Sequence, residues 1–180
     1  MKIIEIILIS LSLATDAFAV SICKGIVIKK NKLKKSIIIS SYFGIFQLLM
    51  TLIGYLFGSL FSSYIINMSY IVSFILLLII GIDMIVESLN NKEYKDEIRF
   101  SEMFFLSLAT SIDALVIGLT FSLFDTNIIL NIILIGIITF ILSFIGVMFG
   151  IKIKKIVKFN SSLLGGIVLI IIGIKILLKH

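Results

Sequence analysis

The chain of 180 residues contains no proline, no tryptophan, one cysteine and one histidine. The single Cys23 excludes an intramolecular disulfide and a metal site built from several thiolates. Charged residues are also scarce, at 14% of the chain, whereas apolar residues make up 60% and the mean hydropathy is +1.26. A soluble domain of this size does not need so much apolar surface, so the composition indicates an integral membrane protein.

Apolar runs separated by short polar segments predict an all-α polytopic membrane protein with six transmembrane helices. Each run is near the roughly 20 residues that cross about 30 Å of hydrocarbon. The separators, including an uncharged turn near 59–67, leave no room for a soluble domain, so residues 1–180 form one membrane domain. Asp16 interrupts the first run, which we therefore expect to be a retained span and not a signal peptide. The predicted spans are 3–24, 36–58, 68–88, 101–122, 128–150 and 162–179.

The lysines and the arginine predict the orientation of the spans. If the first, third and fifth loops share a side, that side holds thirteen of the sixteen basic residues, from Lys24 to Lys158. The other side holds only Lys2, Lys175 and Lys179. Because basic loops stay in the cytoplasm, we expect both termini outside it, in a multi-pass membrane protein. The net charge of +6 is then an orientation signal, and nucleic acid is not an expected partner.

Two aspartates lie in the middle of apolar spans, in similar surroundings. Asp16 occurs in Ser10-Leu-Ser-Leu-Ala-Thr-Asp16-Ala-Phe-Ala, and Asp113 occurs in Ser107-Leu-Ala-Thr-Ser-Ile-Asp113-Ala-Leu-Val. A carboxylate at the bilayer centre costs about 3 kcal/mol or more unless it faces a partner, water or an ion. Two such residues at similar depth therefore indicate a functional site.

The two halves of the chain match beyond these aspartates. Gly44, Gly54 and Gly58 have the same spacing as three glycines located 92 residues later, and the aspartates are 97 residues apart. Each half contains three predicted spans, so the second half enters the membrane with the opposite polarity. The sequence thus predicts two inverted three-helix repeats, at about 3–88 and 101–179, an arrangement typical of secondary transporters with a midplane site.

Six residues are candidate metal ligands: Asp16, Asp113, Gln47, Glu87, Ser12 and Thr110. Ser12 precedes Asp16 by one helical turn, and Thr110 is three residues before Asp113. Carboxylate, hydroxyl and amide oxygens suit hard cations such as Mg²⁺, Ca²⁺ and Mn²⁺. Gln47 could equally form an interhelical hydrogen bond, and Glu87 could guard a cytoplasmic entrance or reach the headgroups. The aspartates could also bond to each other or to hydroxyls, with one of them protonated.

With these residues the chain resembles the MntP-type manganese efflux family of bacterial inner-membrane proteins. The resemblance covers essentially all six predicted spans. It implies a six-helix Mn²⁺ exporter that requires both central aspartates, although some relatives have Glu at position 47 and Pro at position 51. The matching segments are Asp16-Ala-Phe-Ala with Lys24-Gly25, Phe43-Gly44 with Gly54, Met84-Ile-Val-Glu87, Ala109-Thr-Ser-Ile-Asp113-Ala and Leu164-Gly-Gly-Ile-Val-Leu-Ile-Ile-Ile-Gly173.

These observations favour an exporter of divalent cations, with Mn²⁺ as transported substrate and no resident cofactor. The expected partners are the metal ion and the lipid bilayer, and assembly into homo-oligomers stays open. An intramembrane aspartyl protease is disfavoured, since Asp113 is not preceded by the Gly-x-Gly of such enzymes and no other enzyme activity is indicated. A non-transporting scaffold, or an exporter of another cation, is the alternative.

Overall fold

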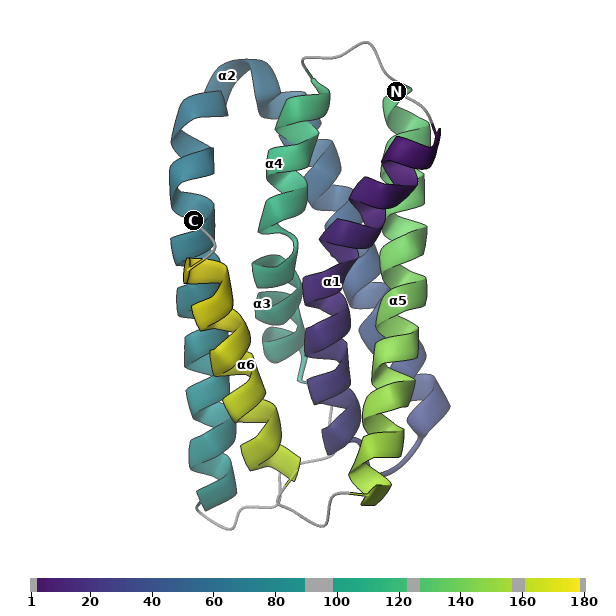
Figure 1. The fold of residues 1–180 in the computed structure, drawn as a ribbon, viewed down its shortest axis with the longest axis vertical. Helices are drawn as coiled ribbons and strands as arrows, with labels where there is room; N and C mark the ends of the chain where they lie inside the picture. Colours follow the sequence, from purple (N-terminus) through teal and green to yellow (C-terminus); the bar gives the residue numbers. More distant parts are fainter. Residues whose placement is uncertain (1–2, 90–98, 123–126, 157–160, 179–180) are drawn as a thin grey trace.

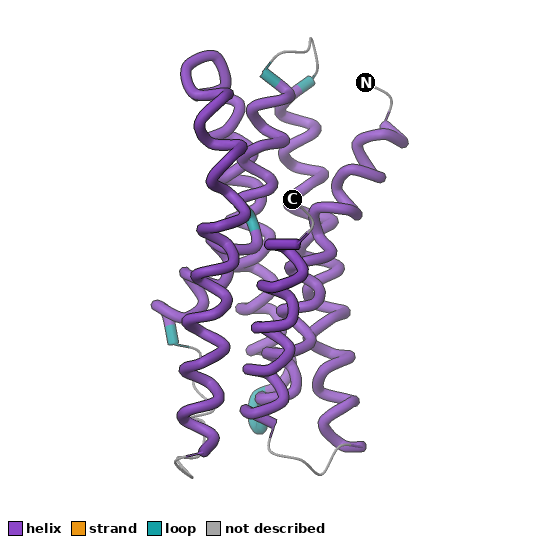
Figure 2. The backbone as a smooth tube through the Cα atoms, turned by 60° about the vertical axis from the view of Figure 1, so that its left-hand side comes forward, coloured by secondary structure: helices purple, strands orange, loops and turns teal. Residues whose placement is uncertain are grey.

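The computed structural model describes residues 3–89, 99–122, 127–156 and 161–178, and these residues form six helical segments. The segments run roughly along the long axis of the molecule, and the described chain contains no strand (Figure 2). The prediction of an all-helical protein is confirmed.

Helices α1 (Ile3–Val27) and α2 (Lys32–Leu89) are joined by a short turn at one end of the molecule. Asn31 adopts a positive φ of 50° in this turn, a conformation that asparagine tolerates better than most residues. Figure 1 shows α2 rising along the bundle, turning over at the far end and descending again. The chain thus reverses direction between the predicted spans 36–58 and 68–88, as the predicted turn near 59–67 requires. The backbone remains helical throughout α2, in a stretch of the sequence that has no proline and no charge.

The fourth predicted span, 101–122, is wrong in one respect, because it is two helices. Helix α3 (Phe100–Thr110) and helix α4 (Ile112–Phe121) meet at Ser111 and are bent by 44°. The Ser111 hydroxyl donates to the carbonyl oxygen of Ser107 at 2.6 Å, and the Ser111 backbone N–H donates to Leu108, three residues back, at 3.2 Å. A side chain that occupies the carbonyl of the preceding turn in this way is a common cause of helix kinks.

Helix α5 (Ile128–Ile156) packs along α1 and against the first half of α2, whereas α6 (Ser161–Leu178) packs against the second half of α2. Glycines allow these close approaches. A Cβ on Gly25 or Gly150 would overlap the facing backbone of α5 or α1, and a Cβ on Gly166 would lie 2.6 Å from the carbonyl oxygen of Gly81. Small residues at helix crossings are typical of membrane helix bundles.

The outer surface of α5 has the character of a lipid-facing helix. Ile137, Ile141, Ile145 and Phe149 recur every four residues and are each about half exposed. Three described segments are long and apolar enough to cross a membrane, namely Ile3–Val27, Lys32–Gly58 and Ile128–Ile153. The bent pair α3–α4 would make a fourth. The chain is therefore a helical membrane protein.

Candidate cation site

The interior of the bundle contains two separate apolar clusters, and Asp16 lies where one gives way to the other. Leu13 of α1 belongs to a cluster with Ala114 of α4 and Ile135 of α5. Ala17, only four residues after Leu13, belongs to a second cluster around Val20. Asp16 is half-buried between these two residues, in an unbroken part of α1.

The broken helix α3–α4 passes from one apolar cluster to the other at the break between its two parts. Ala109 packs in the second cluster and Ala114 in the first, so that Thr110, Ser111 and Asp113 lie between them. Asp113 is in the first turn of α4, where the Ala114 backbone N–H donates to its Oδ1 at 2.8 Å. A carboxylate at this position is favoured by the partial positive charge of a helix N-terminus.

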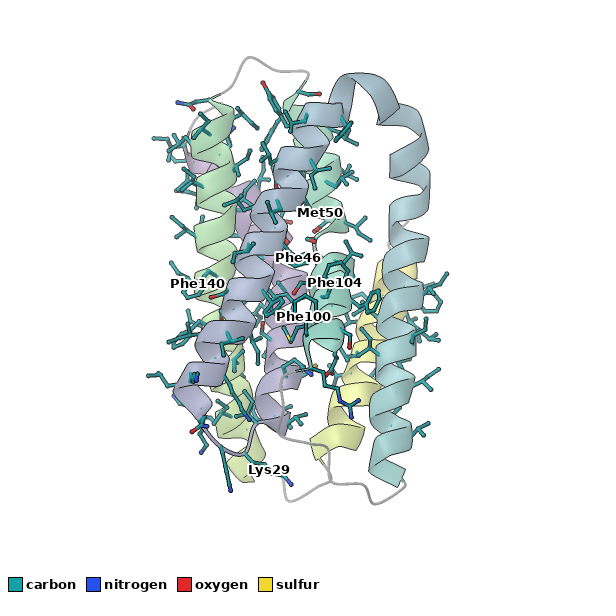
Figure 3. The ribbon with its side chains drawn as sticks, turned by 180° about the vertical axis from the view of Figure 1, so that it is seen from behind. Lys29, Phe46, Met50, Phe100, Phe104 and Phe140 are labelled. Atoms are coloured by element: carbon teal, nitrogen blue, oxygen red, sulfur yellow. The ribbon has the colours of Figure 1, made fainter. Side chains whose placement is uncertain are left out.

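Helix α2 also passes from one apolar cluster to the other, at Gln47. Phe43 belongs to the second cluster, whereas Met50 packs against the first, and Gln47 lies between them with its side chain fully buried. Neither its amide nitrogen nor its amide oxygen has a hydrogen-bond partner among the described residues. Figure 3 shows Phe46 and Met50 at mid-height of the bundle, which places this segment of α2 near the middle of the long axis.

We call the residues between the two apolar clusters the polar layer: Asp16, Gln47, Thr110, Ser111 and Asp113. Four of the six predicted ligands belong to it. Thr110 is buried, and its hydroxyl donates to the carbonyl oxygens of Leu106 at 3.1 Å and Ser107 at 3.3 Å. Its oxygen therefore keeps lone pairs that can accept from another group or ligate an ion.

The structure does not place the other two predicted ligands in the polar layer. Ser12 is on an exposed face of α1, so it is not placed among the buried oxygens. Glu87 is in the last turn of α2, and its side chain lies outside the described part of the structure.

Two buried hydroxyls on α5 were not among the predicted ligands. Thr139 and Ser143 are fully buried, and neither hydroxyl has a hydrogen-bond partner among the described residues. They follow Ile135 of the first cluster and precede Val147 of the second. The sequence did carry a signal for them, because Thr139 and Ser143 stand 92 residues after Gln47 and Thr51.

A buried ion pair joins α1 to α3 beside the second apolar cluster. Lys24 Nζ lies 2.5 Å from Glu102 Oε1, and the two side chains are only 6% and 11% exposed. An aromatic contact between Phe46 and Phe104, with ring centroids 5.3 Å apart, packs α3 against α2 nearby (Figure 3). Helix α3 is thus packed against both α1 and α2 in the turns that precede the break at Ser111.

The chemistry available in the polar layer is that of oxygen ligands. Among the described residues, no group of three or more His, Cys, Asp or Glu side chains could hold a metal ion. A cation bound near the two aspartates would therefore also need hydroxyl, amide or backbone oxygens. Such a set fits hard divalent cations better than metals that prefer thiolates.

The family comparison and the similar curated proteins indicate the same family. The Mntp family, described as "Putative manganese efflux pump", matches residues 30–177. A Clostridium botulinum (strain Hall) protein named "Putative manganese efflux pump MntP 2" is 45% identical, over all of this chain and 96% of the relative. Proteins of Campylobacter jejuni and Desulfitobacterium hafniense (strain Y51), both named "Putative manganese efflux pump MntP", are 46% and 43% identical, over 100% and 98% of this chain and 98% and 95% of the relatives. No solved structure matches the chain.

Proposed function

We propose, from the premise that the chain belongs to the Mntp family, that it exports divalent metal cations across the bacterial inner membrane, with Mn²⁺ as its main substrate. The observation that carries this proposal is the polar layer, in which two carboxylates lie between two apolar clusters of a membrane bundle. Two aspartates neutralise one divalent cation, so the ion can enter the low-dielectric interior without net charge. The chain is then a transporter and not an enzyme.

The proposal includes two inverted three-helix repeats, and equivalent helix contacts support this arrangement. A Cβ on Gly54 would overlap the carbonyl of Leu115, and a Cβ on Gly146 would lie 2.7 Å from the carbonyl oxygen of Phe18. Gly54 and Gly146 are 92 residues apart in the sequence, and Phe18 and Leu115 are 97 residues apart. These are the same two offsets that relate the glycines and the aspartates of the sequence repeat. Gly44 and Gly136 approach each other's carbonyl oxygens, as expected for residues beside a two-fold axis.

In the proposed mechanism the two repeats rock against each other and expose the polar layer alternately to each side of the membrane. Asp16 belongs to an unbroken helix and Asp113 to the first turn of a half-helix, so the two carboxylates have different backbone surroundings. The broken helix allows α4 to move with respect to α3, which is anchored to α1 by Lys24 and Glu102.

The experiment measures cellular manganese after a Mn²⁺ challenge in cells that lack their own exporter. Wild-type protein should lower the manganese content, whereas Asp16→Asn and Asp113→Asn should each abolish at least about nine-tenths of this effect, since either change leaves the ion's charge half compensated. Glu5→Gln is the matched control, because Glu5 is an exposed acid on the same helix as Asp16 and should be dispensable.

Membrane abundance of each variant is measured in parallel. Abundant wild-type protein that leaves manganese unchanged would overturn the Mn²⁺ assignment and favour another cation or a scaffold role. Active Asp→Asn variants would overturn the role of the aspartates.

A further inference from the structure

The two α5 hydroxyls, Thr139 and Ser143, depart from the usual behaviour of hydroxyls in this bundle. Many described serines and threonines satisfy their hydroxyls within their own helix, by donation to the carbonyl four residues back. Ser10 donates in this way to Ile6 at 2.7 Å, and Ser40 donates to Ser36 at 2.7 Å. Thr139 and Ser143 are as deeply buried but make no such bond within the described structure.

Such an arrangement is costly unless another group uses the hydroxyls. A buried hydroxyl without a partner costs about 1–3 kcal/mol, and the carbonyl four residues back was available to each of them. Ser21 and Ser107 share the property, but they lie on the helices that carry the aspartates or lead to them. Thr139 and Ser143 are notable because the described part of α5 holds no acidic residue and was assigned no part in the site.

Helix packing places Ser143 beside the turn that carries Asp16. A Cβ on Gly146 would lie 2.7 Å from the Phe18 carbonyl oxygen, and one on Gly150 would overlap the Ile22 carbonyl. Moving four residues along α5, from Gly146 to Gly150, moves the facing residue four positions along α1, from Phe18 to Ile22. The two helices are therefore parallel and stay in the same register over this stretch. One turn earlier, the same register brings the turn with Ser143 to the turn with Asp16.

Thr139 lies one turn from the point where α5 crosses α2. Gly136 and Gly44 meet where α5 crosses α2, with a Cβ on Gly44 only 2.9 Å from the Gly136 carbonyl oxygen. Thr139 and Gln47 each follow one of these glycines by three residues, and both have buried polar atoms without a partner in the described structure. The crossing therefore brings an amide and a hydroxyl, both unsatisfied, within a turn of the closest approach of the two helices.

We propose that Thr139 and Ser143 of α5, together with Gln47 of α2, supply neutral oxygen ligands to the transported cation, which Asp16 and Asp113 neutralise. This inference rests on the proposed function and adds the residues that replace the hydration shell of the ion. Hydroxyl and amide oxygens are ligands for hard divalent cations. Because they add no negative charge, the ion is coordinated without being held so tightly that it cannot leave.

The test uses purified full-length protein, with Mn²⁺ alone as the probe, and measures both transport in proteoliposomes and thermal stability in detergent. Thr139→Val keeps the shape of the side chain and removes its oxygen, and Ser143→Ala also removes a hydroxyl. Each should raise the KM for Mn²⁺ by about tenfold. Each should also reduce the rise in Tm that Mn²⁺ produces in the wild type.

Without metal, Thr139→Val should be as stable as the wild type or more so, because it removes an unsatisfied buried hydroxyl. Thr139→Ser retains the oxygen and should keep a KM within about threefold of the wild type. Ser40→Ala is the control, since it removes a buried hydroxyl that donates within its own helix, and its KM should be unchanged.

Failure of this inference is distinguishable from failure of the proposed function. Wild-type protein that neither transports Mn²⁺ nor gains stability from it would refute the proposed function, and this inference with it. Wild-type transport with unchanged KM and unchanged Mn²⁺ stabilisation in Thr139→Val and Ser143→Ala would refute the inference alone. A loss of metal-free stability in Thr139→Val, with normal KM, would assign the hydroxyl to packing and would equally refute it.

Discussion

At the scale of single residues, Lys24 and Glu102 form an ion pair that is buried in the described structure, away from the polar layer. Two charges withdrawn from water are costly, and their attraction compensates only when both partners are present. The pair therefore makes α1 and α3 depend on each other. These are the helices that carry or lead to the two aspartates.

This dependence gives a prediction for a double-mutant cycle. Glu102→Leu and Lys24→Met should each lower the free energy of unfolding by about 3–5 kcal/mol, because each removes one partner of a buried ion pair. The double variant should recover to within about 1 kcal/mol of the wild type, since two apolar side chains replace the pair. Denaturation of the purified variants in detergent measures all three values, and additive losses would contradict the coupling.

The sequence could not predict this pair. Lys24 counts among the basic residues that set the orientation, and nothing in its neighbourhood indicates a partner 78 residues away. The aspartates were predictable because a charge in an apolar span is conspicuous, and Gln47 because it is polar in such a span. Thr139 and Ser143 are ordinary residues in membrane helices, and their only signal in the sequence is the 92-residue offset from Gln47 and Thr51. Their burial without a partner in the described structure is what makes that signal meaningful.

At the scale of helices, glycines at the crossings determine how closely the bundle packs. Gly54 of α2 faces the backbone of α4, and Gly150 of α5 faces the backbone of α1. In both cases the facing atom belongs to the backbone and not to a flexible side chain, so an added methyl group can be accommodated only if a whole helix moves.

We therefore expect Gly54→Ala and Gly150→Ala each to destabilise the protein by about 1–3 kcal/mol. Ile141→Ala on the lipid-facing side of α5 is the control, and it should change the free energy of unfolding by less than about 1 kcal/mol because Ile141 is half exposed. Thermal unfolding in detergent ranks the three variants. Equal stability of the glycine variants and the wild type would show that the crossings are looser than the described packing.

The helices themselves could be predicted in large part, because 20-residue apolar runs leave few alternatives to membrane spans. The bend between α3 and α4 could not. It occurs without proline or glycine, at a Thr110-Ser111 pair whose hydroxyls bind the carbonyls of the preceding turn. Similar residues elsewhere, such as Ser40 and Thr51, bond in the same way within continuous helix, so the local sequence does not specify a break.

At the scale of the whole molecule, orientation in the membrane follows from charge and from the course of the helices. The turn between α1 and α2 carries exposed Lys29 and Lys30, whereas Asn127, just before α5, lies at the opposite end of the bundle (Figure 1). By the positive-inside rule the lysine turn should lie in the cytoplasm. Asn127 and the start of α1 should then face outward.

Cysteine labelling in intact cells tests this orientation. Cys23→Ala removes the only cysteine, after which Lys30→Cys and Asn127→Cys each introduce one at an exposed position. A membrane-impermeant maleimide should label Asn127→Cys in intact cells and label Lys30→Cys only after permeabilisation, with at least about a tenfold difference for the latter, since the bilayer excludes the charged reagent. The Cys23→Ala protein should remain unlabelled throughout. The reverse pattern would place both termini in the cytoplasm, and export would then have to proceed from the end of the bundle that carries Asn127.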